Sequence, residues 1–166
     1  MRVGQGFDVH RFSNDPDTPL VLGGVTFEGA RGLEGHSDAD VVCHAIIDAL
    51  LGAAGLGDIG THFRDDDPRW AGCDSTEMLI RTVELVDDAG WVVTNVDCTI
   101  VAEVPRISDH AASMQQNLRE ICRAPVSVKA SRAEGLGALG RHEGIACLSV
   151  ALIGRHSGDR SRYRDD

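Results

Sequence analysis

Three residues in the first third of the chain have the side chains that hold a metal ion. Asp8 and His10 are two residues apart in a segment with strand character, and a strand places such residues on one face. His44 follows in a helical segment. Two imidazoles and one carboxylate leave a fourth tetrahedral position open, and imidazole favours zinc over magnesium. The Asp8–His10 pair alone also fits a solvated strand face, so both interpretations stay open.

The surroundings of His44 also allow two interpretations. Asp40 and Asp48 lie one helical turn away on either side, so the three residues form a polar stripe. This stripe is what a solvated helix face would show. In the alternative, His44 is a third metal ligand and Asp40 or Asp48 holds its other ring nitrogen.

A dense run of polar residues, 34–40, precedes this helix. Ser37 or Asp38 is the predicted N-cap, because a short polar side chain there accepts hydrogen bonds from the first free backbone N–H groups. His36 and Ser37 then stand near a helix N-terminus, where anions bind well. The run therefore predicts an anion site beside the metal ligands.

The elements that must position these residues follow from hydrophobic periodicity. Apolar and β-branched runs predict strands over residues 2–10, 19–22, 25–27, 91–103, 126–130 and 144–153. Helical spacing predicts helices from about 38 to Gly52 or Gly55, from Asp74 to Gly90, and over 107–122. Residues 56–74 and the glycine-rich segment 134–140 are predicted loops. This mixture indicates one α+β domain, 1–153, with a mixed sheet covered by helices on one face.

Composition excludes several classes of protein. The chain has 166 residues and a net charge of −10, so it lacks the basic footprint of a nucleic-acid binder. It has no apolar run of the ~18 residues that a membrane span requires, and no apolar signal segment near its start. Five scattered cysteines without a CxxC pair indicate reduced thiols and a cytoplasmic protein. Residues 154–166 are predicted to be a disordered polar tail.

Five segments together resemble one known family, the 2-C-methyl-D-erythritol 2,4-cyclodiphosphate synthases. They occur in the family's order and spacing, and the resemblance spans about residues 1–153. The segments are Gly6-Phe7-Asp8-Val9-His10, Glu34-Gly35-His36-Ser37-Asp38-Ala39-Asp40-Val41, His44-Ala45-Ile46-Ile47-Asp48-Ala49-Leu50-Leu51-Gly52, Leu56-Gly57-Asp58-Ile59-Gly60 and Gly140-Arg141-His142-Glu143-Gly144-Ile145-Ala146.

The resemblance implies a homotrimer with active sites between neighbouring subunits. The implied substrate is 4-diphosphocytidyl-2-C-methyl-D-erythritol 2-phosphate, used in the non-mevalonate route to isoprenoid precursors. Its 2-phosphate attacks the β-phosphorus, CMP leaves, and the cyclic diphosphate remains. An ionised phosphate needs no strong protein base, so we expect catalysis by positioning and charge neutralisation. Because the substrate is a polyanion and the protein is acidic, positive charge must be provided at the site itself, by bound metal ions and helix N-termini.

The resemblance also assigns roles to individual residues. It implies zinc at Asp8, His10 and His44, with a substrate phosphate oxygen as the fourth ligand. It implies a second metal, magnesium or manganese, at Glu134 between the substrate phosphates. His36, Arg132 and Glu134 are the residues expected to act on the reacting phosphates. Substrate contacts are expected from Asp8, His10, His36, Ser37, Asp58, Ile59, Gly60, Phe63, Asp65, Asp67, Ala102, Pro105, Arg106, Ser108, Ser131, Arg132, Glu134 and Arg141.

The chain departs from the family's pattern just before Glu134. The family has a threonine-rich run there, whereas this chain has Ser131-Arg132-Ala133, so Arg132 replaces a hydroxyl that contacts phosphate. A guanidinium there either adds bidentate contacts to phosphate or obstructs the site. Ala138 stands where many members have a larger apolar residue lining a cavity on the trimer axis, and His142 replaces a common glycine.

Two alternatives follow from these departures. The first is an enzyme of the same fold, also metal-dependent, that cyclises a different nucleoside diphosphate. The second is a trimeric nucleotide-binding protein without turnover. The complete Asp8–His10–His44 set argues against the second, because these residues need no such arrangement without a metal.

Overall fold

The computed structural model describes residues 1–64 and 66–156 and contains one four-stranded mixed sheet. The strand order is β1-β6-β4-β5, so β1 and β5 are its edges. β6 pairs antiparallel with both β1 and β4, whereas β5 runs parallel to β4. A small hairpin, β2–β3, stands apart from the sheet. The strands are β1 Arg2–Arg11, β2 Val21–Leu22, β3 Val25–Thr26, β4 Trp91–Val101, β5 Val126–Ser131 and β6 Gly144–Arg155.

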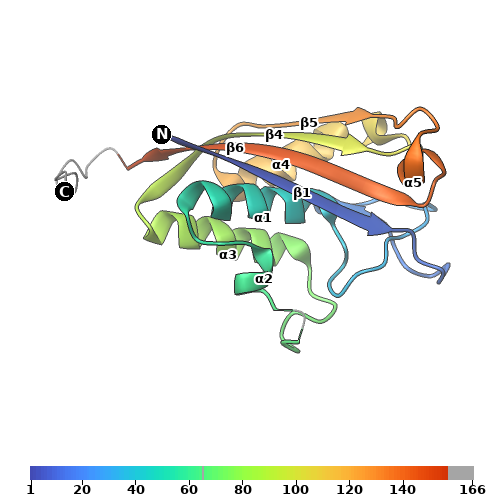
Figure 1. Ribbon diagram of the computed structural model, residues 1–166, viewed down its shortest axis with the longest axis horizontal. Coiled ribbons are helices and arrows are strands. Elements are labelled where there is room, and N and C mark those ends of the chain that lie inside the picture. Colours follow the sequence, from blue (N-terminus) through green and yellow to red (C-terminus); the bar gives the residue numbers. More distant parts are fainter. Residues whose placement is uncertain (65, 157–166) are drawn as a thin grey trace.

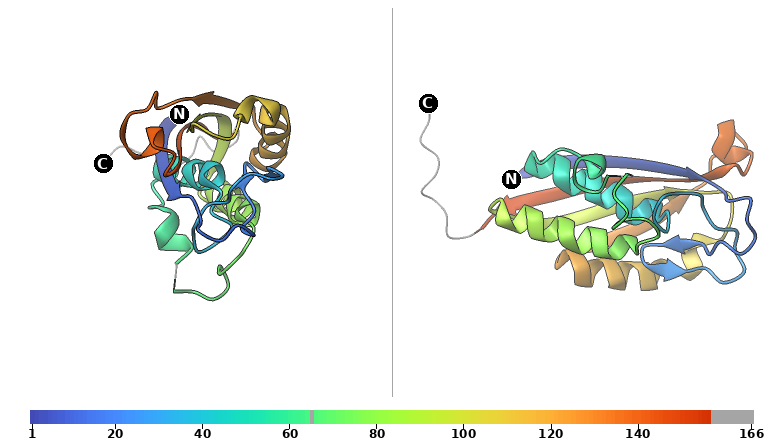
Figure 2. Two further views of the ribbon diagram at one scale, coloured as in Figure 1. Left: turned by 90° about the vertical axis from the view of Figure 1, so that its right-hand side faces the viewer. Right: turned by 90° about the horizontal axis from the view of Figure 1, so that it is seen from below.

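Three long helices cover one face of this sheet, as the sequence predicted (Figures 1 and 2). α1 packs beneath β1 and β6, α4 packs beneath β5, and α3 contacts both helices and β4. Their buried stripes form one aliphatic core with the inner face of the sheet. The helices are α1 Val41–Ala54, α2 Ile59–His62, α3 Ser75–Asp88, α4 Ala111–Cys122 and α5 Gly137–Gly140, with a 3₁₀ turn at Ile107–Asp109.

Two glycines let α1 lie unusually close to β1. A Cβ atom at Gly4 would lie 2.0 Å from the Ala49 carbonyl oxygen, and one at Gly6 would lie 2.0 Å from the Ala45 carbonyl oxygen. Any larger residue at either position would therefore push the helix away from the strand. The close approach places Asp8, two residues beyond Gly6, beside His44.

The other face of the sheet carries no helix and is apolar along β1 and β6. Phe7 and Leu148 are cross-strand partners on this face and are 52% and 40% exposed. Val3, Val9 and Val150 extend the same surface. A contiguous apolar face of this kind marks an interaction surface more often than a solvated one.

Several expected element boundaries differ from the structure. α1 begins later than predicted, because Asp40 rather than Ser37 or Asp38 is its N-cap; the Asp40 carboxylate accepts from the Val42 and Cys43 backbone N–H groups. The helix predicted over 107–122 is divided at His110, which ends a 3₁₀ turn and is the N-cap of α4. Two predicted loops each contain a short helix, α2 and α5.

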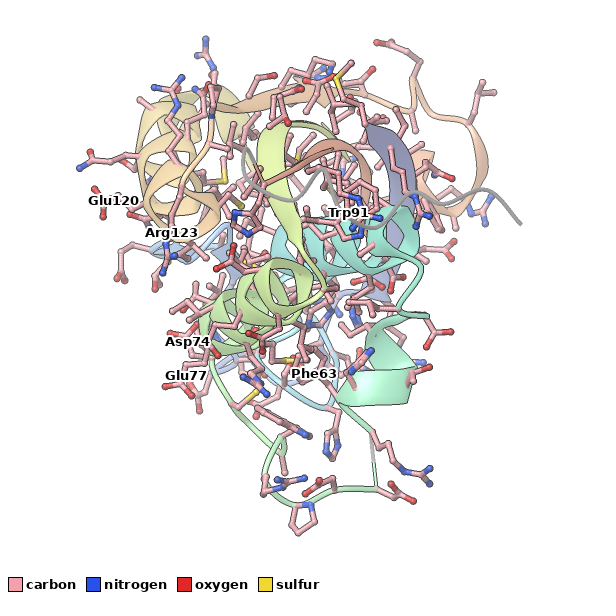
Figure 3. All side chains as sticks on the ribbon, turned by 90° about the vertical axis from the view of Figure 1, so that its left-hand side faces the viewer. Phe63, Asp74, Glu77, Trp91, Glu120 and Arg123 are labelled. Atoms are coloured by element: carbon pink, nitrogen blue, oxygen red, sulfur yellow. The ribbon has the colours of Figure 1, made fainter. Side chains whose placement is uncertain are left out.

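β6 is two residues longer than predicted, so the domain boundary at 153 and the tail from 154 are wrong for Gly154 and Arg155. Arg155 pairs with Trp91 on β4, and its guanidinium stacks 3.9 Å from the centre of the indole ring. Arg2 of β1 covers the same ring at 4.7 Å, so arginines from two strands enclose Trp91 at one end of the sheet. Figure 3 labels Trp91. The tail predicted beyond residue 156 lies outside the described residues.

The described part of the chain contains no helix that is both long and apolar enough to span a bilayer.

Candidate metal centre and substrate site

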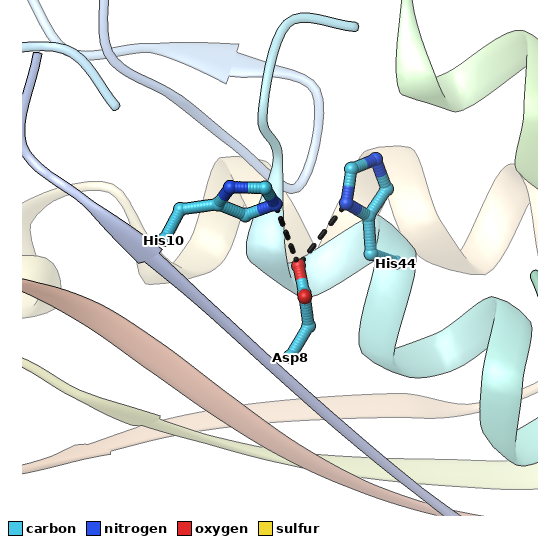
Figure 4. Close-up of side chains that lie close together, drawn as sticks. All are labelled: Asp8, His10 and His44. Atoms are coloured by element: carbon cyan, nitrogen blue, oxygen red, sulfur yellow. Dashed lines mark hydrogen bonds and ion pairs between the residues drawn. The ribbon is translucent and has the colours of Figure 1, made fainter. Parts of the chain in front are cut away.

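Asp8, His10 and His44 meet at one point, although they come from two elements. Oδ2 of Asp8 lies 3.2 Å from His10 Nε2 and 3.1 Å from His44 Nδ1 (Figure 4). One ligand atom from each residue lies within 4.8 Å of the other two, as a single coordinated ion requires. The set of one carboxylate and two imidazoles therefore fits a divalent metal, as the sequence predicted.

The electrostatics of the cluster favour a charged carboxylate between the two rings. Burial opposes ionisation of Asp8, but its hydrogen bonds to His10 and His44, and their charges, hold its pKa well below the usual range. Burial also opposes protonation of His10, yet the hydrogen bond and charge of Asp8 raise the pKa of His10 above its ordinary 6.5. Without a cation, Asp8 therefore favours a proton on His10, and a divalent ion would displace that proton.

The ring nitrogen of each histidine that faces away from Asp8 has its own partner. His10 Nδ1 lies 2.8 Å from the Glu34 carbonyl oxygen, which can only accept, so this nitrogen donates. In the neutral ring, the form that binds a metal, the lone pair is then on Nε2. His44 Nε2 lies 2.9 Å from Ser75 Oγ and 3.1 Å from Ser37 Oγ. Such contacts fix the tautomer and the orientation of a ligating imidazole.

Neither aspartate predicted to hold His44 does so. Asp40 is outside the helix and its carboxylate accepts from four backbone N–H groups, those of Gly23, Gly24, Val42 and Cys43. Asp48 accepts from the Ile59 N–H and so fixes the start of α2. Helix spacing alone predicted both contacts, whereas backbone N–H groups outside that pattern occupy both carboxylates.

A cavity of about 400 Å³ opens beside the metal cluster. The residues that line it were largely predicted as site residues: Asp8, His10, His36, Ser37, His44, Ile59, Gly60 and Phe63. Trp70 and Met78 also line it and were missed. Phe63 and Trp70 pack edge to face at 4.9 Å, so they form an apolar wall opposite the charged residues. A larger hollow of about 610 Å³, formed by segments of residues 13–31, has no group of metal ligands.

The other residues predicted in the 56–74 segment have mainly local contacts. Asp58 is the N-cap of α2 and accepts from the backbone and side chain of Thr61, beside Gly60. Asp67 is paired with Arg69 on the outer side of the segment. Asp65 lies outside the described residues.

A second, smaller cavity of about 210 Å³ collects the predicted cytidine-side residues. It lies where β4 and β5 end and is lined by Ala102, Glu103, Pro105, Arg106, Ile107, Ser108, Ala130, Ser131 and Arg132. Arg106 donates to Ser108 Oγ at 3.0 Å. One carboxylate oxygen of Glu103 is buried and has no hydrogen-bond partner among the described residues. Glu103 was not predicted, and only its place in the 102–108 segment could have indicated it.

Glu134 and Arg141 line neither cavity. Glu134 is exposed in the turn after β5, at a φ of +52° that residues with a side chain rarely adopt. Arg141 donates to Glu143 at 2.6 Å beside α5. The two cavities themselves belong to opposite edges of the sheet, because Asp8 and His10 are on β1 and Ser131 ends β5. Three strand spacings, about 14 Å, separate these edges.

Comparison with known proteins gives consistent matches. The model of the YgbB family matches residues 1–154. A 2-C-methyl-D-erythritol 2,4-cyclodiphosphate synthase from Bordetella avium is 52% identical over 94% of this chain and 97% of that protein. The structure of the bifunctional IspDF from Campylobacter jejuni has a TM-score of 0.88 and 38% identity over 93% of this chain, but only 42% of that longer chain. The CDP complex of IspF from Plasmodium falciparum has a TM-score of 0.81 and 31% identity over 94% of this chain and 97% of its own.

Proposed function

The chain belongs to the YgbB family, and from this premise we propose that its Asp8–His10–His44 cluster binds zinc at the reaction centre of a cyclodiphosphate synthase. The enzyme is a lyase of isoprenoid biosynthesis: it converts 4-diphosphocytidyl-2-C-methyl-D-erythritol 2-phosphate to 2-C-methyl-D-erythritol 2,4-cyclodiphosphate and CMP. The observation that carries the residue assignment is the metal cluster with an open cavity beside it. The cytoplasm stays the predicted location.

The reaction needs positioning and charge neutralisation rather than a strong base. An oxygen of the 2-phosphate forms a bond to the β-phosphorus, and the bridging oxygen leaves with its electron pair as part of CMP. Zinc, when bound, neutralises charge on a substrate phosphate oxygen. His36 and Ser37 line the same cavity as the ligands, so they are placed to orient the phosphates there. Asp58, Ile59 and Gly60, with Phe63, are proposed to bind the erythritol part.

The nucleotide side of the site is proposed to lie in the smaller cavity. Ala102, Pro105, Arg106, Ser108 and Ser131 would hold the cytidine, and Arg132 would contact the diphosphate through its guanidinium. Glu134 is proposed to hold a second metal, magnesium or manganese, between the substrate phosphates. Its exposure in a turn leaves its carboxylate free to do so. Arg141 and Asp67 stay predicted substrate contacts, although they line neither cavity. Asp65 also stays a predicted contact and lies outside the described residues.

One substrate must reach both cavities, and this supports a homotrimer. The edge of one copy that carries β1 would lie beside the β5 edge of the next, so each site would draw on two copies. Because the two edges differ, each copy would bind the next through a different surface, and such a chain of copies closes only if the rotation between neighbours divides a full turn. A threefold rotation gives a closed trimer. The apolar outer face of β1 and β6 would be covered inside such a ring.

The departures at Arg132 and Ala133 keep one alternative open, a cyclase for a different nucleoside diphosphate. An extra guanidinium next to the diphosphate would suit a substrate with more negative charge there. A nucleotide-binding trimer without turnover is disfavoured, because the complete ligand set has no purpose in it.

Phosphorus NMR of the zinc-loaded protein tests the proposal. We expect the two diphosphate resonances of the substrate to be replaced by those of a cyclic diphosphate and a monophosphate. Substrate that binds but stays intact would support the protein without turnover. Absence of binding, together with cyclisation of another nucleoside diphosphate, would support the altered substrate.

A further inference from the structure

His44 is held on the side away from Asp8 by a relay of hydrogen bonds that ends on a carboxylate. Its Nε2 lies 2.9 Å from Ser75 Oγ, and Ser75 Oγ in turn donates to Asp38 Oδ1 through a short bond. Asp38 Oδ2 also accepts from the Ser75 backbone N–H at 3.1 Å. We propose that Ser75 is a positioning residue, through which Asp38 fixes the orientation and tautomer of His44 as a metal ligand. This inference rests on the proposed metal site.

The direction of every proton in the relay follows from its ends. Ionised Asp38 can only accept, so the Ser75 hydroxyl must donate to it and keeps its lone pairs for His44. His44 Nε2 therefore carries a hydrogen and donates it to Ser75. The lone pair of the neutral ring is then on Nδ1, which is the atom that faces Asp8.

This assignment of protons does not fix the acceptor of the Ser37 hydroxyl. Ser37 Oγ lies 3.1 Å from His44 Nε2 and 3.2 Å from Ser75 Oγ, so its oxygen is within reach of the relay. The Ser37 hydroxyl can donate to the second lone pair of Ser75 Oγ or, with a phosphate bound, turn into the cavity and donate to that phosphate. The relay thus separates two serines of similar position: Ser75 holds the ligand, and Ser37 faces the substrate.

The hydroxyl of Ser75 has no competing structural duty at its helix. Ser75 is the first residue of α3 and is fully buried, but the preceding Asp74 caps the helix by accepting from the Thr76 N–H. The separation of 31 positions between His44 and Ser75 explains why sequence patterns did not connect them. The relay therefore fixes the place of α3 relative to α1 at the metal centre.

The test is the metal affinity of the full chain with Ser75→Ala, measured by zinc titration against a chromophoric chelator. Loss of a partner that orients a ligating histidine typically lowers metal affinity about 10–100-fold, and we expect that range. The visible absorption of the cobalt-substituted protein should change as well, because the ligand geometry is less constrained. Ser149→Ala removes another buried serine hydroxyl, on β6 in the core, and is expected to leave both measurements unchanged. Wild-type zinc affinity and cobalt absorption in Ser75→Ala would overturn the proposal.

A double-mutant cycle with Asp38→Ala keeps the inference testable if Ser75→Ala folds poorly. If Asp38 acts through Ser75, Asp38→Ala alone lowers the zinc affinity. The zinc affinity of the double variant is then no lower than that of the single variant with the larger loss. Additive losses, or wild-type affinity in Asp38→Ala, would show that there is no relay. Both readouts are independent of turnover. A wild-type protein that binds one zinc through the relay without cyclising the substrate would refute the proposed function alone.

Discussion

The metal half and the nucleotide half of the proposed site differ in how far one chain completes them. The metal half is assembled from β1, α1 and the start of α3, and each histidine has partners on both ring nitrogens. The nucleotide half is a cavity of about 210 Å³ at the ends of β4 and β5, and its arginines and serines are exposed. From this difference we propose that the metal half can form in an isolated chain, whereas the nucleotide half is completed by a neighbouring copy.

The two halves also differ in charge. The metal half carries a carboxylate and imidazoles, whose cation must come from outside. The nucleotide half has the guanidiniums of Arg106 and Arg132, in a chain whose net charge is −10. A substrate with phosphates at both ends of this arrangement is therefore neutralised by a bound metal on one side and by side chains on the other.

Removal of a metal ligand should give the largest effect. We expect His44→Ala to abolish zinc binding and to lower turnover by more than about 10³-fold, because both charge neutralisation and phosphate positioning are lost. Zinc per chain is measured by elemental analysis after dialysis. His156→Ala, which removes a histidine paired with Asp87 away from the site, is the matched control. Zinc occupancy near one in His44→Ala would exclude this residue as a ligand.

Arg132→Thr tests the nucleotide half without touching the metal half. If the guanidinium contacts the diphosphate, turnover should fall by about 10²–10³-fold, the usual loss for one charge-stabilising contact. Zinc occupancy should not change. Arg119→Thr alters an exposed arginine on α4 and is the control. Unchanged turnover would place Arg132 outside the mechanism, and a large increase would favour the altered substrate.

The dependence of the nucleotide half on a neighbour can be tested by mass. Light scattering should give about 53 kDa, three times the chain mass of 17.7 kDa. Phe7→Glu places a charge on the apolar face of the sheet and should lower this mass and the turnover together, while each chain keeps its zinc. A wild-type protein that has the monomer mass and full turnover would show that the nucleotide half does not depend on a neighbouring copy.

The smallest expected effect concerns an ion pair on the uncovered sheet face. The hydrogen bonds from Lys129 and Ser127 lower the pKa of Asp97 below its ordinary value of 3.8. A carboxyl with a lowered pKa stabilises the folded state above the unfolded pKa, and this contribution is lost as the pH falls through the folded pKa. Asp97→Asn should therefore lower the free energy of unfolding by about 0.2–1 kcal/mol at pH 7, the range for exposed pairs.

Chemical denaturation at pH 7 and near pH 2 measures this difference. The two proteins should converge in stability at the lower pH. A loss well above 1 kcal/mol at pH 7 would indicate that the pair is buried, as it would be if a neighbouring copy covered this part of the sheet.

The sequence predicted the metal half well, because its pattern is local. Asp8 and His10 follow strand periodicity, and His44 lies on a strongly periodic helix, so only the contact between two elements had to be inferred. The wrong partners, Asp40 and Asp48, came from helix spacing alone; backbone N–H groups took both carboxylates. Ser75 and Trp70 were missed because they reach the site from elements distant in sequence. The separation of the cavities depends on the strand order β1-β6-β4-β5, which periodicity does not determine.

The closeness of α1 and β1 has a consequence for mutational tolerance. Gly4 and Gly6 are not among the metal ligands and line neither cavity, yet a methyl group at either would displace the helix that carries His44. In a saturation mutagenesis scan of cells whose growth depends on this enzyme, substitutions at both glycines should reduce growth as strongly as substitutions of the metal ligands. Gly52 on the same helix has open space around it and should accept alanine. The functional footprint of the metal is thus wider than its coordination sphere, and it includes two positions whose only contribution is the absence of a side chain.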